Sequence, residues 1–120
     1  MNPLLRKFAS LALLLLAVWG GTQALQMWSR NRLGADAAEN AKPGDIQMLS
    51  SLTCPYCEAA RAWFTEYRVP FDECFIERDA ACEAKFNALL SPGTPMILVR
   101  GQRQVGFDAQ QVVKALQLPR

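Results

Sequence analysis

The sequence predicts an α/β domain, in which a mixed β-sheet carries helices on its faces, preceded by an N-terminal hydrophobic helix. Three observations predict this class. Strand-type and helix-type patterns alternate between residues 46 and 90, an apolar run at 96–99 is followed by a tight turn, and an amphipathic segment closes the chain. The resulting order is β-α-β-α-β-β-α. The alternating half implies a right-handed parallel crossover, and the closing strands form an antiparallel hairpin in a three-layer sandwich.

The first half of the domain reads as strand, helix and strand. Residues 46–49 form a short strand candidate. Pro55 suits the first turn of the following helix, because an N–H group is not needed there. The inner face of this helix is formed by Ala60, Trp63, Phe64 and Tyr67. Val69-Pro70 ends the helix, and residues 71–76 are the second strand candidate.

The second half adds a helix, a hairpin and a last helix. Asp79 can cap a helix whose apolar stripe holds Cys82, Phe86, Leu89 and Leu90. Residues 91–93, Ser-Pro-Gly, stop that helix, and the run at 96–99 is typical of a strand buried on both faces. Residues 100–102 form a tight turn before a return strand at 103–105. Asp108 with Gln111 resembles a capping box that opens the last helix.

The N-terminal segment predicts a membrane anchor. Arg6 and Lys7 precede residues 8–29, which carry no charge. A positive start and an apolar stretch also fit a secretory signal peptide, and a stretch of about 20 apolar residues can span a bilayer. We favour an uncleaved anchor with the N-terminus inside. A signal cleaved near Ala24 and a buried helix of a soluble protein are the alternatives.

This segment divides the chain into three parts. Residues 1–29 are the anchor or signal segment, residues 30–44 a linker with few large apolar residues and a closing Pro-Gly, and residues 45–120 the folded domain. A domain of this size buries only about 60% of its unfolded surface, which excludes a large multidomain enzyme. We expect the domain to lie on the periplasmic, exported side of the membrane, or to be released there after cleavage.

Charge and residue types exclude further classes. Residues 1–44 hold five basic and two acidic side chains, whereas residues 45–120 hold eight basic and nine acidic ones. The folded part therefore has no basic surface of the kind that binds nucleic acid. The chain contains no histidine, so histidine can serve neither as a general base nor as a metal ligand. The four cysteines carry the most reactive chemistry available.

Cys54-Pro55-Tyr56-Cys57 is a C-x-x-C motif between a strand and a helix. The thiolate is the reactive form of cysteine, and a helix N-terminus stabilises negative charge through its N–H groups and dipole. Cys54 therefore lies where its pKa should fall, and Cys57, one turn later, can reach it. This context favours a redox pair. A structural metal half-site and an inert disulfide are the alternatives.

Cys74 and Cys82 form a second pair of cysteines outside the motif. Cys82 lies on the apolar stripe of its helix, where a free cysteine acts as a small hydrophobic residue. An exported domain would instead oxidise such a pair, and a small domain gains much from a disulfide. Both readings, and a regulatory or metal role, stay open at this point.

The motif and two later elements resemble the glutaredoxin family of the thioredoxin superfamily. The motif Cys54–Cys57 is similar to the family's dithiol, Thr94-Pro95 to its cis-proline element, and the Gly-Phe-Asp at 106–108 to its Gly-Asp region. The resemblance covers residues 45–120. It implies a thioredoxin-like, glutaredoxin-like fold and thiol–disulfide exchange, in which Cys54 attacks and Cys57 resolves.

The same resemblance implies the substrate-binding residues. The loop at cis-Pro95 would present backbone groups to a peptide or to glutathione, and Tyr56 would form part of the rim. The candidate substrate-binding residues are Tyr56, Thr94, Pro95, Gly106, Phe107 and Asp108. Asp108 could meet the glutathione amine, although a capping role is the simpler interpretation. The family's basic residue before the motif is replaced here by the neutral lead-in of residues 50–53, as in glutaredoxin-like forms that use another thiol donor.

The sequence therefore predicts a membrane-tethered, monomeric thiol–disulfide oxidoreductase with no bound cofactor or metal. Its expected substrates are protein disulfides or glutathione mixed disulfides, with glutathione or another thiol as reductant. Two rival functions use the same residues. One is a metal or iron–sulfur binding module built on the cysteines, and the other is a non-catalytic adaptor that keeps the fold.

Overall fold

The computed structural model describes residues 2–119, which form two compact units. One contains the described residues up to Arg32, and the other runs from Leu33 onward. The elements are α1 (Pro3–Asn40), β1 (Ile46–Ser50), α2 (Pro55–Glu66), β2 (Asp72–Phe75), α3 (Ala80–Ala88), β3 (Met96–Val99), β4 (Gln102–Val105) and α4 (Ala109–Gln117). From β1 onward their order is the predicted one.

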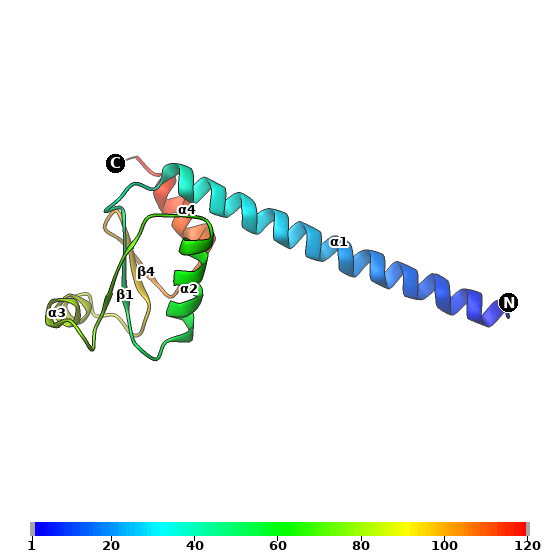
Figure 1. Cartoon of the computed structure of the whole chain (residues 1–120), viewed down its shortest axis with the longest axis horizontal. Helices are drawn as coiled ribbons and strands as arrows, with labels where there is room; N and C mark the ends of the chain where they lie inside the picture. The colour runs from blue at the N-terminus through cyan, green and yellow to red at the C-terminus, as the bar shows by residue number, and fades with distance from the viewer. Residues whose placement is uncertain (1, 120) are drawn as a thin grey trace. The chain divides into compact units, whose positions relative to one another are not determined.

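The second unit is built on a four-stranded mixed sheet with the strand order β2-β1-β3-β4. β1 and β2 are parallel, whereas β3 is antiparallel to both β1 and β4. Helices α2 and α4 lie on one face of the sheet and α3 lies on the other (Figure 1). The predicted α/β sandwich is therefore confirmed, including the parallel first crossover and the closing hairpin.

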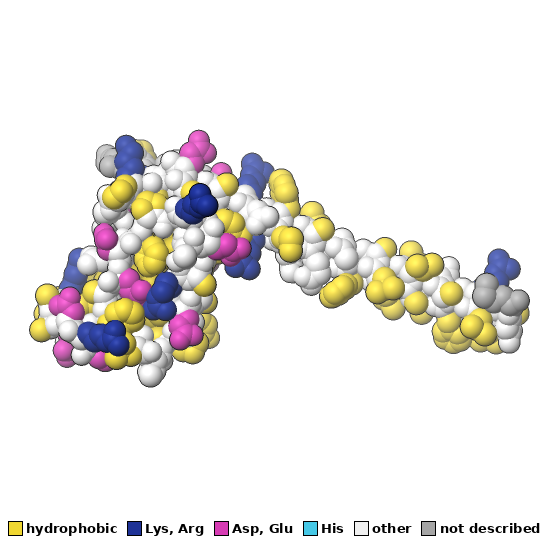
Figure 2. Space-filling model, in the orientation of Figure 1, with side chains coloured by type: hydrophobic (Ala, Val, Ile, Leu, Met, Phe, Trp, Pro, Cys, Tyr) yellow, Lys and Arg dark blue, Asp and Glu magenta, His cyan; other side chains and the backbone are white. Residues whose placement is uncertain are grey.

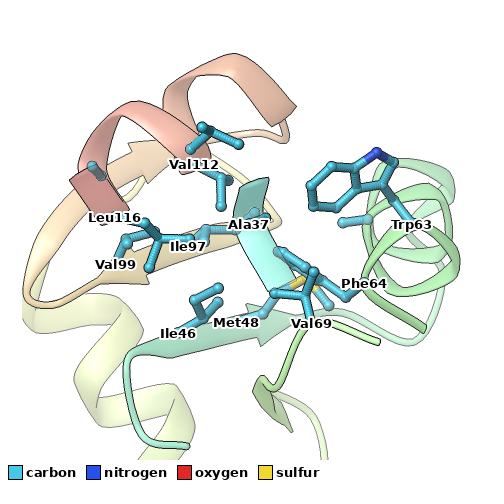
Figure 3. Packing of buried hydrophobic residues seen from close by; sticks show 13 residues of the cluster. Ala37, Ile46, Met48, Trp63, Phe64, Val69, Ile97, Val99, Val112 and Leu116 are labelled. Atoms are coloured by element: carbon cyan, nitrogen blue, oxygen red, sulfur yellow. The ribbon is translucent and has the colours of Figure 1, made fainter. Parts of the chain in front are cut away.

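The larger core lies between the sheet and helices α2 and α4. Alternate residues of the central strands point into it, as the two-residue period of a strand requires. Its buried residues include Ile46 and Met48 from β1, Ile97 and Val99 from β3, Trp63 and Phe64 from α2, and Val112 and Leu116 from α4 (Figure 3). Burying side chains of this size contributes about 1.5–3 kcal/mol each, so this larger cluster contributes more burial free energy than the smaller one on the other face.

The opposite face carries a smaller core under α3. Leu49, Met96 and Leu98 are buried there together with Cys82. All four residues of β3 are buried, as expected for a central strand covered on both faces. The N-terminus of α3 is capped by Asp79, whose carboxylate accepts the N–H of Ala81 at 2.9 Å.

The apolar stripe predicted for α3 extends too far. The helix ends at Ala88, and Leu90 lies beyond it at a φ of 52° with 84% of its surface exposed. The left-handed backbone at Leu90 turns the chain out of the helix, so a helical spacing no longer applies to its side chain.

The segment expected to be a linker differs most from the prediction. Helix α1 continues to Asn40, and Ala37 is fully buried in the larger core. Figure 3 shows Ala37 between α2 and α4, among labelled residues of both helices. Gly34 is also buried. Small side chains let this part of the helix approach the domain closely, so the absence of large apolar residues does not indicate a linker here.

The first unit is the preceding part of α1, from Pro3 to Arg32. It holds an apolar stretch long enough to cross a membrane, and none of that stretch is buried. Figure 2 shows hydrophobic side chains along it. A membrane anchor and a signal sequence near an N-terminus share this length and composition. Within this unit the guanidinium of Arg32 lies 5.4 Å from the centre of the Trp28 ring.

Candidate active site

The site is centred on the N-terminus of α2. Cys54 is the N-cap residue, with extended backbone angles, and Pro55 occupies the first turn. The backbone N–H of Cys57 donates to the Sγ of Cys54 at 3.1 Å. The helix thus directs one of its unpaired N–H groups at this sulfur, where it would stabilise a thiolate.

The two sulfurs of the motif are joined in a disulfide, and they differ in access. The Cα atoms of Cys54 and Cys57 lie 5.2 Å apart. Cys54 retains 6% of its surface, whereas Cys57 retains none. Of the two residues, Cys54 is therefore the one that solvent can reach.

The strand register brings the other candidate residues to the same edge of the sheet. Leu49 pairs with Met96, so the loop after β1 and the residues before β3 leave the sheet side by side. Met96 also pairs with Val105 at the end of β4. The Thr94–Pro95 bond is cis, and the N–H of Gly106 donates to the Pro95 carbonyl at 2.8 Å. The loop that leads to the motif, the Thr94-Pro95 turn and Gly106 therefore meet at one end of the sheet.

This fold and motif have known relatives. The Glutaredoxin family model matches residues 46–104. The chain contains a glutaredoxin domain. No curated protein sequence matches the chain significantly.

Solved structures agree on the fold of this glutaredoxin domain. A mutant of the thioredoxin-like protein BC3987 is 21% identical, with a TM-score of 0.56 over 63% of this chain and 99% of its own. The glutaredoxin of Methanosarcina mazei is 20% identical, with a TM-score of 0.53 over 62% and 80%. The buckwheat glutaredoxin–glutathione complex is 18% identical, with a TM-score of 0.52 over 79% and 88%. At these identities the likeness concerns the fold.

Phe107 and Asp108, two further candidate residues of the glutaredoxin domain, also make structural contacts. The ring of Phe107 lies 5.4 Å from that of Trp63 and 5.6 Å from that of Phe64, so Phe107 closes one end of the aromatic core. Asp108 caps α4, and its carboxylate accepts the N–H of Gln110 at 2.9 Å. Tyr56 is 73% exposed, directly beside the motif cysteines in the sequence.

A partly buried ionic network involves Ser50, the last residue of β1 before the loop that leads to the motif. Ser50 is fully buried, and its hydroxyl donates to Glu73 at 2.6 Å. The Arg61 guanidinium donates to both carboxylate oxygens of Glu73, at 2.7 and 2.8 Å. Burial by itself would raise the pKa of Glu73, but the hydrogen bonds from Arg61 and Ser50 and the positive charge of Arg61 hold this pKa below its usual value. The network joins β1, α2 and β2.

A second carboxylate contacts the loop itself. Glu77, in the turn between β2 and α3, accepts hydrogen bonds from the hydroxyl of Ser51 and, at 3.2 Å, from the N–H of Leu52. The hydrogen bond from Ser51 lowers the pKa of Glu77. Sequence reasoning missed Glu73 and Glu77, because their partners lie 12 to 26 positions away along the chain and only folding brings them together.

The second cysteine pair lies apart from the motif. Cys74 on β2 and Cys82 on α3 form a disulfide, with their Cα atoms 6.0 Å apart. Cys82 is 3% exposed in the core under α3. Among the described residues, no cluster of three or more histidine, cysteine or acidic side chains is placed to hold a metal ion.

Proposed function

We propose that this protein is a thiol–disulfide oxidoreductase in which Cys54 is the nucleophile and Cys57 the resolving cysteine. The observation that carries the proposal is the position of Cys54 at the N-cap of α2, with the N–H of Cys57 directed at its sulfur. The difference in burial supports the same assignment of roles, because only Cys54 has exposed surface.

The reaction follows from these positions. The Cys54 thiolate attacks one sulfur of a substrate disulfide, forms a mixed disulfide and releases the first substrate thiolate, which takes up a proton. The Cys57 thiol loses its proton, and its sulfur attacks the Sγ of Cys54. The Cys54–Cys57 disulfide forms and the second substrate thiolate leaves. Two electrons pass from the dithiol to the substrate, and two equivalents of glutathione or of another thiol donor return them.

The turn at Thr94-Pro95 is the proposed binding site for the substrate backbone. The N–H of Gly106 donates a hydrogen bond to the carbonyl of Pro95, and this bond holds the turn against the end of β4. We therefore assign peptide or glutathione contacts to the backbone of Thr94 and to the exposed ring of Tyr56. Phe107 and Asp108 support the site through the aromatic core and the α4 cap, with glutathione contact as a further role of Asp108.

An exported location fits the disulfides and the N-terminal helix. Disulfides persist in oxidising compartments and are rare in a reducing cytosol. The stretch of α1 before Arg32 would hold the domain at the membrane, or direct its export before cleavage. Partner proteins would then be disulfide-containing proteins of the same compartment.

The full chain in detergent tests the function. We expect it to reduce a glutathione mixed disulfide or insulin disulfides with a thiol donor present, and Cys54→Ser to abolish both reactions. Glu83→Ala is the control, because it changes an exposed side chain of α3 outside the motif. Full turnover by Cys54→Ser, or no turnover by the parent on either substrate, would contradict the proposal.

A further inference from the structure

The turn between β2 and α3 contacts the loop that leads to Cys54 at successive positions. The N–H of Ile76 donates to the Ser50 carbonyl at 3.0 Å, which extends the pairing of β1 and β2 beyond the strand. The carboxylate of Glu77 then receives the hydroxyl of Ser51 and the N–H of Leu52. The chain from Ser50 to Leu52 is therefore held by its neighbour immediately before it reaches Cys54.

The turn that carries Glu77 is itself fixed at both ends. The disulfide between Cys74 and Cys82 closes the segment that contains it, and the N–H groups of Arg78 and Asp79 both donate to the Phe75 carbonyl at 3.1 Å. Asp79 then caps α3. Glu77 is thus presented from a closed turn whose backbone has little freedom, which makes its carboxylate a fixed point for the loop before Cys54.

That loop needs such a fixed point. Leu52 is 44% exposed and neither it nor Thr53 belongs to a helix or strand. A thiolate at an N-cap is stabilised only while its sulfur stays aligned with the N–H groups of the helix, because the effect of a helix terminus falls off within one turn. Movement of the backbone before Cys54 would weaken that alignment.

We propose that Glu77 is a positioning residue for the redox reaction, which fixes the backbone of Ser51 and Leu52 and thereby holds the sulfur of Cys54 at the N-terminus of α2. The inference rests on the proposed function, because it assigns Glu77 a role toward the Cys54 thiolate. Glu77 acts through the loop. A direct effect of its negative charge would be the opposite one, since a nearby carboxylate raises the pKa of a thiol.

Loss of loop positioning would raise the pKa of Cys54, whereas loss of a nearby negative charge would lower it, so a pKa measurement separates the two effects. Cys57→Ser leaves Cys54 as the one free thiol while Cys74 and Cys82 stay paired, which a thiol titration checks. In that background the rate of Cys54 alkylation by iodoacetamide, measured against pH, gives the pKa of the thiol. We expect Glu77→Ala to raise this pKa and to slow alkylation at pH 7 about threefold or more, because hydrogen bonds to a charged acceptor are lost.

Three single variants and one double variant separate loop positioning from other effects. Glu77→Gln keeps an acceptor oxygen and should restore part of the rate. Ser51→Ala removes a donor to Glu77 but keeps the carboxylate, and should shift the pKa in the same direction as Glu77→Ala. The shifts of these two variants should not add in the double variant, because both remove one interaction. Glu83→Ala removes a different exposed carboxylate, on α3 itself, and should leave the profile unchanged.

The outcomes are distinct. An unchanged pKa in Glu77→Ala, or a lowered pKa in both Glu77→Ala and Glu77→Gln, would overturn the positioning role. A Cys57→Ser parent whose Cys54 has the ordinary thiol pKa of about 8.5 would instead contradict the proposed function and its premise that α2 activates the sulfur. Thermal unfolding of each variant by circular dichroism confirms that the compared proteins are folded.

Discussion

Helix α1 packs against α2 through a direct contact between the backbone at Gly34 and the ring of Tyr67, the C-cap residue of α2. A Cβ atom added at Gly34 would overlap three atoms of that ring, including the one attached to the Tyr67 Cβ. Tyr67 cannot move away easily, because its ring also lies 5.3 Å from that of Trp63. The last turns of α1 are therefore part of the domain.

Gly34→Ala should destabilise the domain. Alanine has the higher helix propensity by about 1 kcal/mol, but overpacking against Tyr67 costs about 1–3 kcal/mol, so we expect a net loss or at best no gain. Gly20→Ala is the matched control in the same helix, since nothing lies near its added Cβ. Urea unfolding of the full chain in detergent measures both. Clear stabilisation by Gly34→Ala would contradict the packing of α1 on Tyr67.

The network around Glu73 predicts a second loss of stability. Glu73→Ala leaves the fully buried hydroxyl of Ser50 without its partner and removes both hydrogen bonds from Arg61. We expect a loss of about 1–3 kcal/mol in the free energy of unfolding at pH 7. Asp72→Ala, an exposed carboxylate on the same strand, should cost much less. Equal losses in the two variants would show that the network is not stabilising.

The same network predicts a pH dependence. The pKa of Glu73 is lowered in the folded chain from an ordinary value of 4.5. Its contribution to stability is therefore fully present above that ordinary value and is lost as the pH falls through the lower, folded-state pKa. The parent should lose stability below about pH 4.5, and Glu73→Ala should lose less over that range. Glu77 contributes in the same direction, so the slope should diminish rather than vanish. Parallel curves for parent and variant between pH 6 and pH 3 would contradict this assignment.

The disulfide between Cys74 and Cys82 predicts a third effect on stability. Its removal in Cys74→Ala/Cys82→Ala frees a short loop in the unfolded chain and should cost about 2–3 kcal/mol. The buried position of Cys82 adds a small packing loss. Chemical unfolding of this variant, compared with the oxidised parent, measures the effect. An unchanged midpoint would mean that the pair contributes nothing to the fold.

Much of the fold could be predicted because its signals are local. The apolar run at 96–99, the capping residues Asp79 and Asp108 and the start of α2 at Pro55 each depend on neighbours within a few positions. The end of α1 could not be predicted in this way. The small size of residue 34 is explained by the ring of Tyr67 against it, a contact that no local sequence pattern indicates.

The candidate site also contains residues that local sequence signals predict and residues that they do not predict. The motif at Cys54 and Cys57 and its position at a helix N-terminus follow from the sequence. The carboxylates of Glu73 and Glu77 do not, because their partners come from strands and loops that are distant along the chain. Acidic residues in edge strands and turns usually face solvent, so no sequence pattern separates Glu73 and Glu77 from the other acidic side chains.

The central claim is that Cys54 is the sulfur that attacks the substrate. The most direct measurement is mass spectrometry of peptides from the full chain carrying Cys57→Ser after reaction with glutathione disulfide, with Cys54→Ser treated in parallel. We expect one glutathione per chain, attached at Cys54, and no glutathione at Cys57 in the parallel Cys54→Ser sample. Attachment at Cys57 in Cys54→Ser at the same rate, or no adduct at Cys54, would contradict it.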